Sequence, residues 1–345
     1  MVPESLGLAG AEVVLDFFCQ SICFTGFIFV ILYCTFWWFL PSHVIVVLSV
    51  LSVISGVACL LYFRKRRPAD SHLERFMQPS ASSNGVIAHR GGAADAPENT
   101  LLAIQEAKKN GADGVEVDVE ITKDGVAILM HDATIDRTTD GTGFISQMMW
   151  DEVSQLNAAA KFSSSSRSKI SYEAVPTLDE VVQECLNLKL RIFFDVKAYS
   201  KQMVDELIKL YQKYPGLYDN GMICSFFPTT IYRVRQLDSE ILTALTTEPY
   251  FISGQVMKRW TGPPTWWKLL PFAIIDKILQ WSLHNWLWIL CGNSAMLLQK
   301  DTISQNVIRY WSARGLTVIP WTVNKKTDKE FLASLDCHYI TDCIK

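Results

Sequence analysis

Two long apolar runs without charges lie near the start of the chain. The first, Phe17 to Leu40, has 24 residues, and the second, Val44 to Phe63, has 20; a short Pro-Ser-His turn separates them. Because about 20 apolar residues cross a bilayer core, the pattern predicts a hairpin of two transmembrane helices, at about 17–40 and 44–63. A cleaved signal peptide has a shorter apolar core after a basic start, whereas this start is acidic, with Glu4, Glu12 and Asp16.

A basic tetrad, Arg64-Lys65-Arg66-Arg67, follows the second run directly. Positive charge beside a span favours the cytoplasmic side, and a two-span hairpin would put both the N-terminus and the large domain there. The alternative is that the tetrad is a solvated stop on either side of the membrane. We therefore expect an integral multi-pass protein of an endomembrane or the plasma membrane, with the side of the large domain left open. The N-terminal region comprises residues 1–67. The Pro, Ser and Asn residues in 68–84 then indicate a linker.

From Gly85 onward, short β-rich runs alternate with helical stretches. Eight β-rich runs are present, at 86–90, 115–121, 191–197, 222–226, 241–245, 295–300, 317–324 and 338–342. Helical patterns lie between most of them, at 98–110, 178–188, 203–214, 229–237, 304–314 and 328–335. This alternation predicts an α/β fold, a (β/α)8 TIM barrel over residues 85–345. The turn at Lys123-Asp124-Gly125 marks 126–132 as the return arm of the second strand and not as a ninth barrel strand.

Composition narrows the classes of function. The chain has 345 residues and a formal net charge of −3, which argues against nucleic-acid binding because that calls for a basic face. Hydrophobic residues make up 49% of the chain, and the excess is concentrated in the N-terminal runs. The nine cysteines include no close pair with metal-ligand spacing, so buried apolar cysteines are favoured over a disulfide framework or a zinc site.

Ionisable residues gather at the ends of the predicted strands, where the active site of such a barrel lies. His89 and Arg90 end the first strand. Glu116 and Asp118 lie on the second strand at i and i+2, a spacing that points both side chains to one face. His131 ends the return arm of that strand.

Later strands add to this set. Asp195 and Lys197 end the third strand with the same i, i+2 spacing. Trp321 and Asn324 end the seventh strand, and Thr341 and Asp342 end the eighth. Three carboxylates on neighbouring strands, without cysteine, describe a site for a hard cation, Mg²⁺ or alternatively Ca²⁺.

The remaining side chains suit a phosphate ester. An arginine and a lysine beside a metal can stabilise negative charge on the non-bridging oxygens. Two histidines can serve as general acid and general base at neutral pH. Taken singly, each piece has a structural alternative: a packed histidine, a solvated strand edge, a salt-bridged strand, or Asp95 or Asn99 as the cap of the first helix. The chemical interpretation depends on all of them meeting at one end of the barrel.

The motif series resembles the glycerophosphodiester phosphodiesterase family. It comprises HRGGAADAPENT, then GVEVDVEITKDGVAILMHDATIDRTTDGTG, and downstream FFDVK, WTVN and YITD. The resemblance runs from Gly85 to the C-terminus. With its two-span N-terminus and Trp-rich insert, the chain is most similar to the membrane-anchored animal branch. That branch is associated with glycerophosphoinositol, lyso-N-acyl phosphatidylethanolamines and glycerophospho-N-acylethanolamines.

The resemblance implies a role for each candidate residue. The acid/base pair would be His89 and His131. The metal ligands would be Glu116, Asp118 and Asp195. The phosphate contacts would be Arg90 and Lys197, and the supporting residues Glu98, Trp321 and Asn324. The family often has Glu where this chain has Asp195, a shorter carboxylate that still coordinates.

The resemblance also implies the reaction. Metal-dependent hydrolysis would convert glycerophosphodiesters to sn-glycerol 3-phosphate and an alcohol, or lysophospholipids to lysophosphatidate in a lysophospholipase D reaction. The expected partners are such a substrate and the lipid bilayer. Two alternatives remain: a phospholipase C or sphingomyelinase D-like phosphodiesterase, and a catalytically silent membrane scaffold for signalling proteins. The intact histidines and carboxylates argue against the scaffold.

Residues 250–294, between the fifth and sixth strands, form a Trp-rich insert. It holds six of the eleven tryptophans. The stretch 271–292 is strongly apolar but carries Asp276, Lys277 and His284, so it is too polar for a confident third span. It predicts either a helix in the membrane interface or a buried helix that covers the barrel.

Overall fold

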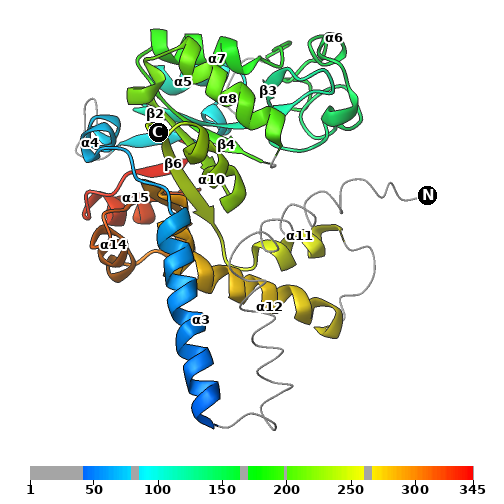
Figure 1. Cartoon of the computed structure of the whole chain (residues 1–345). Coiled ribbons are helices and arrows are strands. Elements are labelled where there is room, and N and C mark those ends of the chain that lie inside the picture. The colour runs from blue at the N-terminus through cyan, green and yellow to red at the C-terminus, as the bar shows by residue number, and fades with distance from the viewer. Residues whose placement is uncertain (1–41, 79–84, 164–169, 198–199, 260–265, 345) are drawn as a thin grey trace.

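The computed structural model of the chain describes residues 42–78, 85–163, 170–197, 200–259 and 266–344 (Figure 1). Within them, eight parallel strands form the sheet: β1 Val86–Ala88, β2 Gly114–Ile121, β4 Arg191–Val196, β5 Gly221–Ser225, β6 Leu242–Thr247, β7 Ala295–Gln299, β8 Thr317–Trp321 and β9 Tyr339–Thr341. Their order is β8-β7-β6-β5-β4-β2-β1-β9. A hydrogen bond from Val323 N to Ile340 O, 2.9 Å long, joins the two ends of this order. The predicted TIM barrel is confirmed.

Alternation along β2 and β4 separates the helix-facing residues from the residues that point into the barrel. Val115, Val117 and Val119 belong to the apolar core beneath the helices, so Glu116 and Asp118 point into the barrel. On β4, Phe194 belongs to the same helix-side core, whereas Phe193 belongs to the core inside the barrel. The register pairs Asp118 with Asp195, which places these two carboxylates side by side.

The second strand has the predicted return arm. Strand β3, Ala127–Leu129, pairs antiparallel with β2 and with no other strand of the sheet. Outside the Trp-rich insert, the main described helices between the barrel strands are α5 Leu101–Lys109, α7 Leu178–Asn187, α8 Lys201–Lys213, α10 Pro228–Leu237, α14 Gln305–Ser312 and α15 Lys326–Ala333. Helix α5 begins later than predicted because Thr100 is its N-cap, with Oγ1 accepting a 3.1 Å hydrogen bond from Ala103 N. The cap is therefore neither Asp95 nor Asn99.

The segment expected to be a linker contains a helix that closes one end of the barrel. Helix α4, Asp70–Met77, lies within residues 68–84. Its Phe76 is fully buried in the inner core, with its ring 5.1 Å from that of Phe193. Since Phe193 comes two residues before Asp195 on the same face, Phe76 lies under the carboxylates, at the N-terminal end of the barrel. Leu73 and Met77 of the same helix also pack against this inner core, so residues 70–77 form a docked helix where the polar composition indicated a linker.

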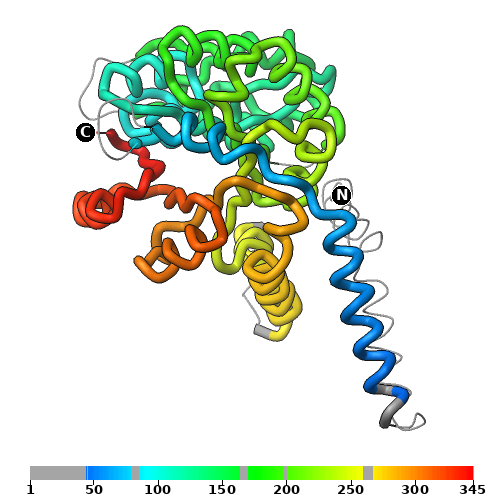
Figure 2. The backbone as a smooth tube through the Cα atoms, turned by 60° about the vertical axis from the view of Figure 1, so that its left-hand side comes forward, coloured from blue at the N-terminus to red at the C-terminus, as the bar shows by residue number. Residues whose placement is uncertain are grey.

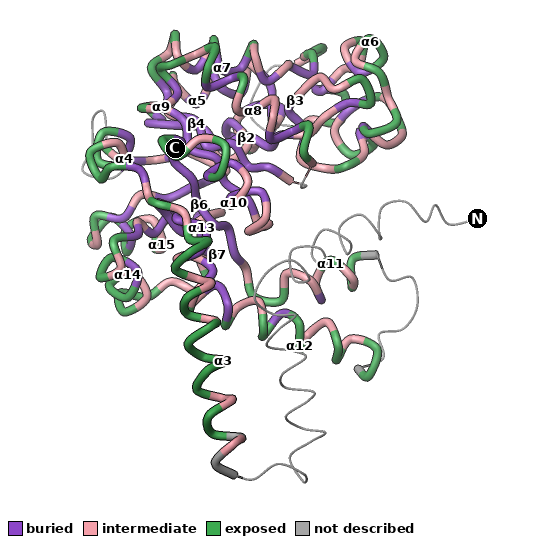
Figure 3. Tube along the Cα trace, in the orientation of Figure 1, coloured by how far each residue is buried: buried purple, intermediate pink, exposed green. Residues whose placement is uncertain are grey.

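One apolar helix precedes the barrel. Helix α3, Ser42–Phe63, has 22 residues and is about 33 Å long at 1.5 Å per residue, enough to cross a bilayer core. No residue of its window Val46–Phe63 is buried, although Leu60 packs against the core, and the helix projects from the barrel (Figures 2 and 3). This matches the second predicted span. The first, at 17–40, lies outside the described residues.

The Trp-rich insert folds as a helical hairpin. It comprises α11 Phe251–Arg259, α12 Trp266–Ser282, the π-turn η3 Leu283–Leu287 and α13 Trp288–Cys291. Asp276 of α12 is buried and caps α11, with Oδ1 accepting from Ile252 N at 2.8 Å and Oδ2 from Ser253 N at 3.0 Å. The insert divides into a buried part and a part with exposed apolar side chains. Leu283, Leu287 and Leu290 are buried in the core, while α12 exposes a row of large apolar side chains: Trp267, Leu270, Ile274, Ile278 and Trp281.

Candidate active site

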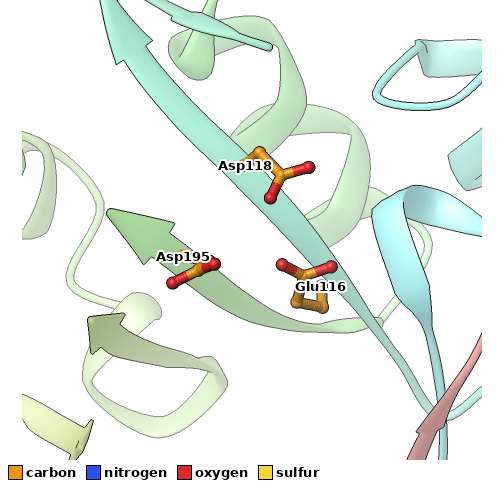
Figure 4. A group of neighbouring side chains, drawn as sticks. All are labelled: Glu116, Asp118 and Asp195. Carbon is orange, nitrogen blue, oxygen red and sulfur yellow. The ribbon is translucent and has the colours of Figure 1, made fainter. Parts of the chain in front are cut away.

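Three buried carboxylates from two neighbouring strands converge inside the barrel. Glu116 and Asp118 come from β2 and Asp195 from β4 (Figure 4), and one carboxylate oxygen of each lies within 4.8 Å of the others. They are at most 5% exposed. Their proximity follows from the i, i+2 spacing on β2 and the Asp118–Asp195 register pair.

This triad carries negative charge that the protein neutralises only in part. Lys197 Nζ lies 2.6 Å from Asp118 Oδ1 and 2.5 Å from Asp195 Oδ2. Burial, and next the charge of Asp118, raise the pKa of Glu116 to about 7. Asp195 Oδ1 is buried and has no hydrogen-bond partner among the described residues. An all-oxygen, acidic and incompletely satisfied set fits a hard divalent cation, so the triad is a candidate metal site.

His89 is held at the edge of the triad by a carboxylate. It begins the 3₁₀ turn η1, His89–Gly91, directly after β1. Its Nδ1 lies 2.5 Å from Asp342 Oδ1, and its Nε2 lies 3.8 Å from Glu116 Oε2. Burial lowers the pKa of His89, but Glu116 and Asp342 outweigh burial and raise the pKa above its usual value. The ring is thus oriented with Nε2 toward the carboxylate triad.

His131 has the same kind of partner. Its Nδ1 lies 2.6 Å from Asp132 Oδ1. Asp132 Oδ2 in turn accepts a 2.5 Å hydrogen bond from Arg137 Nε. The hydrogen bond to His131 and the Arg137 guanidinium hold the pKa of Asp132 well below its usual range. An ionised carboxylate at Nδ1 favours the tautomer that keeps Nε2 available for proton transfer.

Arg90 links the η1 turn to the triad. Its φ of 53° is in the left-handed region, and its backbone N donates to Glu116 Oε2 at 2.9 Å. Its side chain donates from Nη1 to Glu98 Oε1 at 3.1 Å, and Nε lies 3.6 Å from Asp118 Oδ2. Arg90 therefore lies beside two of the three carboxylates, as the sequence predicted.

Glu98 and Asn99 support this arrangement from the loop before α5. Arg137 donates to both Glu98 oxygens, from Nη1 at 2.9 Å and from Nη2 at 2.7 Å. Asn99 is buried; its Nδ2 donates to Asp118 Oδ2 at 2.7 Å and its Oδ1 accepts from Asp118 N at 3.0 Å. Asn99 thus fixes the carboxylate of Asp118 instead of capping a helix.

Trp321 at the end of β8 and Asn324 just after it reach the site indirectly. Asn324 Nδ2 donates to Asp342 Oδ2 at 2.5 Å, and Asn324 Oδ1 accepts from Asp342 N at 2.9 Å. Asn324 therefore positions the partner of His89. Trp321 packs edge-on against Phe226, with ring centroids 6.0 Å apart, and Phe226 stacks on Phe251 of α11 at 4.7 Å. These three aromatic residues connect the barrel mouth to the Trp-rich insert.

Comparison with known proteins identifies the family. The model of the Glycerophosphoryl diester phosphodiesterase family matches residues 89–343. Glycerophosphodiester phosphodiesterase 1 from Mus musculus is 44% identical over 87% of this chain and 93% of its own length, and the Homo sapiens protein of that name is 48% identical over 74% and 77%. The chain belongs to the glycerophosphodiester phosphodiesterase family. It is an enzyme of that activity class, a phosphoric diester hydrolase.

Solved structures agree on the fold of this family member. A glycerophosphodiester phosphodiesterase from Agrobacterium tumefaciens superposes with a TM-score of 0.59 at 21% identity, over 76% of this chain and 97% of that one. An Oleispira antarctica phosphodiesterase, solved in complex with the product sn-glycerol-3-phosphate, superposes with a TM-score of 0.56 at 21% identity, over 75% and 92%. These likenesses support the barrel assignment.

Sequence reasoning missed two residues of the phosphodiesterase site and the role of a third, Asn99. Asp132 stands next to His131 in the HD pair, and Arg137 lies five residues later in a loop that was compatible with a plain turn. The ion pair between Arg137 and Glu98 joins residues 39 positions apart, a contact that strand and helix patterns do not reveal. The adjacency of His131 and Asp132 was the one available signal.

Proposed function

We propose that the chain hydrolyses glycerophosphodiesters to sn-glycerol 3-phosphate and a free alcohol, using a divalent cation and two histidines. The observation that supports this most is the meeting of a buried carboxylate triad with two imidazoles, each paired with a carboxylate at Nδ1. Glu116, Asp118 and Asp195 would hold the cation, Mg²⁺ or alternatively Ca²⁺. When bound, the cation would stabilise charge on the phosphate oxygens.

Other side chains of the site would bind the phosphate and transfer protons. Arg90 and Lys197 lie beside the triad and would bind the non-bridging oxygens of the substrate phosphate. One of His89 and His131 would remove the proton from the attacking oxygen, and the other would protonate the leaving alcohol. The attacking oxygen is either water or the glycerol 2-hydroxyl, which would give a cyclic phosphate before hydrolysis. Asp342 and Asp132 would orient the two imidazoles throughout.

The apolar surface of the protein outside the barrel supports a lipid-linked substrate class. Helices α3 and α12 project on the same side of the barrel (Figures 1 and 2), and both expose large apolar side chains. We propose that α3, together with the first predicted span at 17–40, anchors the protein in an endomembrane or the plasma membrane as a multi-pass protein. Helix α12 would then lie in the interface with Trp267 and Trp281 among the headgroups.

This placement would bring the barrel mouth to the lipid. The stack of Phe251 on Phe226 offers an apolar path from α11 toward Trp321. A lysophospholipid or a glycerophospho-N-acylethanolamine could reach the site with its acyl chain on this path, alongside soluble glycerophosphoinositol.

A product assay tests the proposed function. The purified full-length protein is incubated with glycerophosphoinositol, glycerophosphocholine or lyso-N-acyl phosphatidylethanolamine, each with Mg²⁺, Ca²⁺ or EDTA. The proposal expects glycerol 3-phosphate from the first two and lysophosphatidate from the third, in the presence of metal and not of EDTA. A phosphorylated head group as product would indicate phospholipase C chemistry instead, and no product from any substrate would support the scaffold.

A further inference from the structure

The junction between α3 and the barrel contains a basic cavity that the proposed reaction does not use. The cavity has a volume of about 690 Å³ and is lined by the last turn of α3, the tetrad Arg64 to Arg67, and Trp288, Ile289 and Gly292. Helix α13 ends at Cys291, just before β7, so the cavity lies at the N-terminal end of the barrel. The carboxylate triad lies toward the opposite end.

Two of the four cations dock the membrane helix on the barrel. Lys65 N donates to Leu290 O at 2.9 Å, and its ammonium lies 4.5 Å from the centroid of the Tyr232 ring. Arg67 Nη1 donates to Arg314 O at 2.8 Å and Gly315 O at 3.0 Å, and its guanidinium lies 5.2 Å from the Trp288 ring. Burial lowers the pKa of Arg67 below its usual value, and the opposite effect of Asp70 offsets this only in part. These contacts make the junction a packed interface.

Gly292 shows how closely the two parts approach. Its φ of 62° is left-handed, and a Cβ at this position would overlap the carbonyl oxygen of Lys65. The carbonyl of Arg66 accepts from Nη2 of Arg235, a buried residue of α10. These contacts fix the backbone of the tetrad, and so they fix the positions from which its side chains extend.

The other two cations, Arg64 and Arg66, are exposed. No described acidic side chain forms an ion pair with either of them, and no described residue that lines the cavity is acidic. They follow directly after a helix long and apolar enough to span a bilayer. Lipid phosphates lie at this depth in a membrane, and juxtamembrane Arg and Lys bind anionic headgroups there.

We propose that this cavity binds the headgroup of an anionic phospholipid, with Arg64 and Arg66 on the phosphate and Trp288 and Ile289 against the upper acyl carbons. The proposal rests on the membrane-spanning role of α3 and not on the phosphodiester chemistry. Arginine suits the ligand because its planar guanidinium can donate two parallel hydrogen bonds to a phosphate. The bound lipid fixes the angle between α3 and the barrel, and hence the distance of the mouth from the bilayer.

Titration of the full-length protein in neutral detergent tests the proposal. Phosphatidylglycerol is added to micelles, in EDTA to prevent turnover, and binding is followed by the rise in melting temperature and by native mass spectrometry. Phosphatidylcholine, inorganic phosphate and glycerol 3-phosphate are the comparison ligands. We expect phosphatidylglycerol alone to bind at low concentration, and the Arg64→Gln/Arg66→Gln double variant to bind it roughly 30-fold more weakly.

The matched control removes two exposed lysines from other helices, Lys109→Gln on α5 and Lys209→Gln on α8. It should bind phosphatidylglycerol like the wild type. Equal affinity in the wild type and the Arg64/Arg66 variant overturns the proposal, and so does equal binding of free phosphate. Alkaline extraction of membranes tests separately whether α3 anchors the protein. Hydrolysis of glycerophosphoinositol by the wild type tests the proposed reaction, so failure of the anchoring or of the reaction can be told apart from failure of lipid binding.

Discussion

His89 Nδ1 and Asp342 Oδ1 lie 2.5 Å apart although the two residues are 253 positions apart in the chain. They directly follow β1 and β9, which are neighbouring strands of the barrel. This pairing affects the pKa of His89, and hence the pH dependence of activity. Burial lowers the pKa of His89, but Glu116 and Asp342 raise it further than burial lowers it. Asp342→Asn removes a carboxylate that stabilises the imidazolium, so the pKa of His89 should fall.

The expected result is a shift in the pH profile of kcat/KM. The limb due to His89 should move to lower pH in Asp342→Asn, whether His89 acts as acid or as base, since either role follows the same pKa. Asp301→Asn, a change at an exposed aspartate that pairs with Lys300 and not with a histidine, should leave the profile in place. A limb that does not move, or that moves to higher pH, would contradict the pairing.

Arg137 is expected to act as a positioning residue. It holds Asp132, the partner of His131, and both oxygens of Glu98. Arg137→Lys keeps the charge but cannot make the same set of hydrogen bonds. We expect kcat for glycerophosphoinositol to fall about 10- to 100-fold with a smaller change in KM. Arg233→Lys on the exposed face of α10 is the control. An unchanged kcat in Arg137→Lys would show that the hydrogen bonds of Arg137 do not position the catalytic groups.

Phe76 should contribute strongly to stability. Truncating a fully buried phenylalanine costs about 3–5 kcal/mol in other proteins, and Phe76 is fully buried against the inner core. Phe76→Ala should therefore lower the melting temperature well below that of Phe331→Ala, which truncates a half-exposed phenylalanine of α15. Equal melting temperatures would mean that residues 70–77 behave as the simple linker that the sequence suggested.

Substitutions on α12 separate interfacial from packing roles. Trp267 and Trp281 are 57% and 62% exposed, so Trp267→Glu/Trp281→Glu should preserve the fold. If α12 lies in the membrane interface, turnover of lyso-N-acyl phosphatidylethanolamine in vesicles should fall at least tenfold while that of glycerophosphoinositol changes little. Tyr172→Glu/Phe331→Glu adds the same charges at exposed aromatic positions elsewhere. Equal losses on both substrates would instead favour a packing role.

The sequence predicts the barrel and most of the triad because both follow from local patterns. The eight strands come from short β-rich runs between helical stretches, the return arm from a turn, and the pairing of Glu116 with Asp118 from alternation within one strand. The motif series then supplied the family. Asp195 could be assigned to the same site because consecutive barrel strands are neighbours.

Tertiary contacts account for what the sequence did not predict. Helix α4 reads as polar apart from a few residues, so nothing local marks Phe76 as the residue that closes the barrel. The role of Asn99 depends on its φ of 59° and on the facing backbone of Asp118. In the insert, α12 is exposed and η3 is buried because of which part of the insert meets the barrel. The mixed composition of the insert was compatible with both an interfacial and a buried helix.

Glu116, Asp118 and Asp195 are proposed to hold a divalent cation that the hydrolysis requires. Metal titration of the full-length protein after EDTA treatment, which records bound Mn²⁺ and glycerophosphoinositol turnover together, tests this proposal. We expect saturable binding, recovery of activity in parallel with binding, and loss of both in Asp195→Asn but not in Asp301→Asn. Full turnover in excess EDTA, or unchanged metal binding in Asp195→Asn, would contradict it.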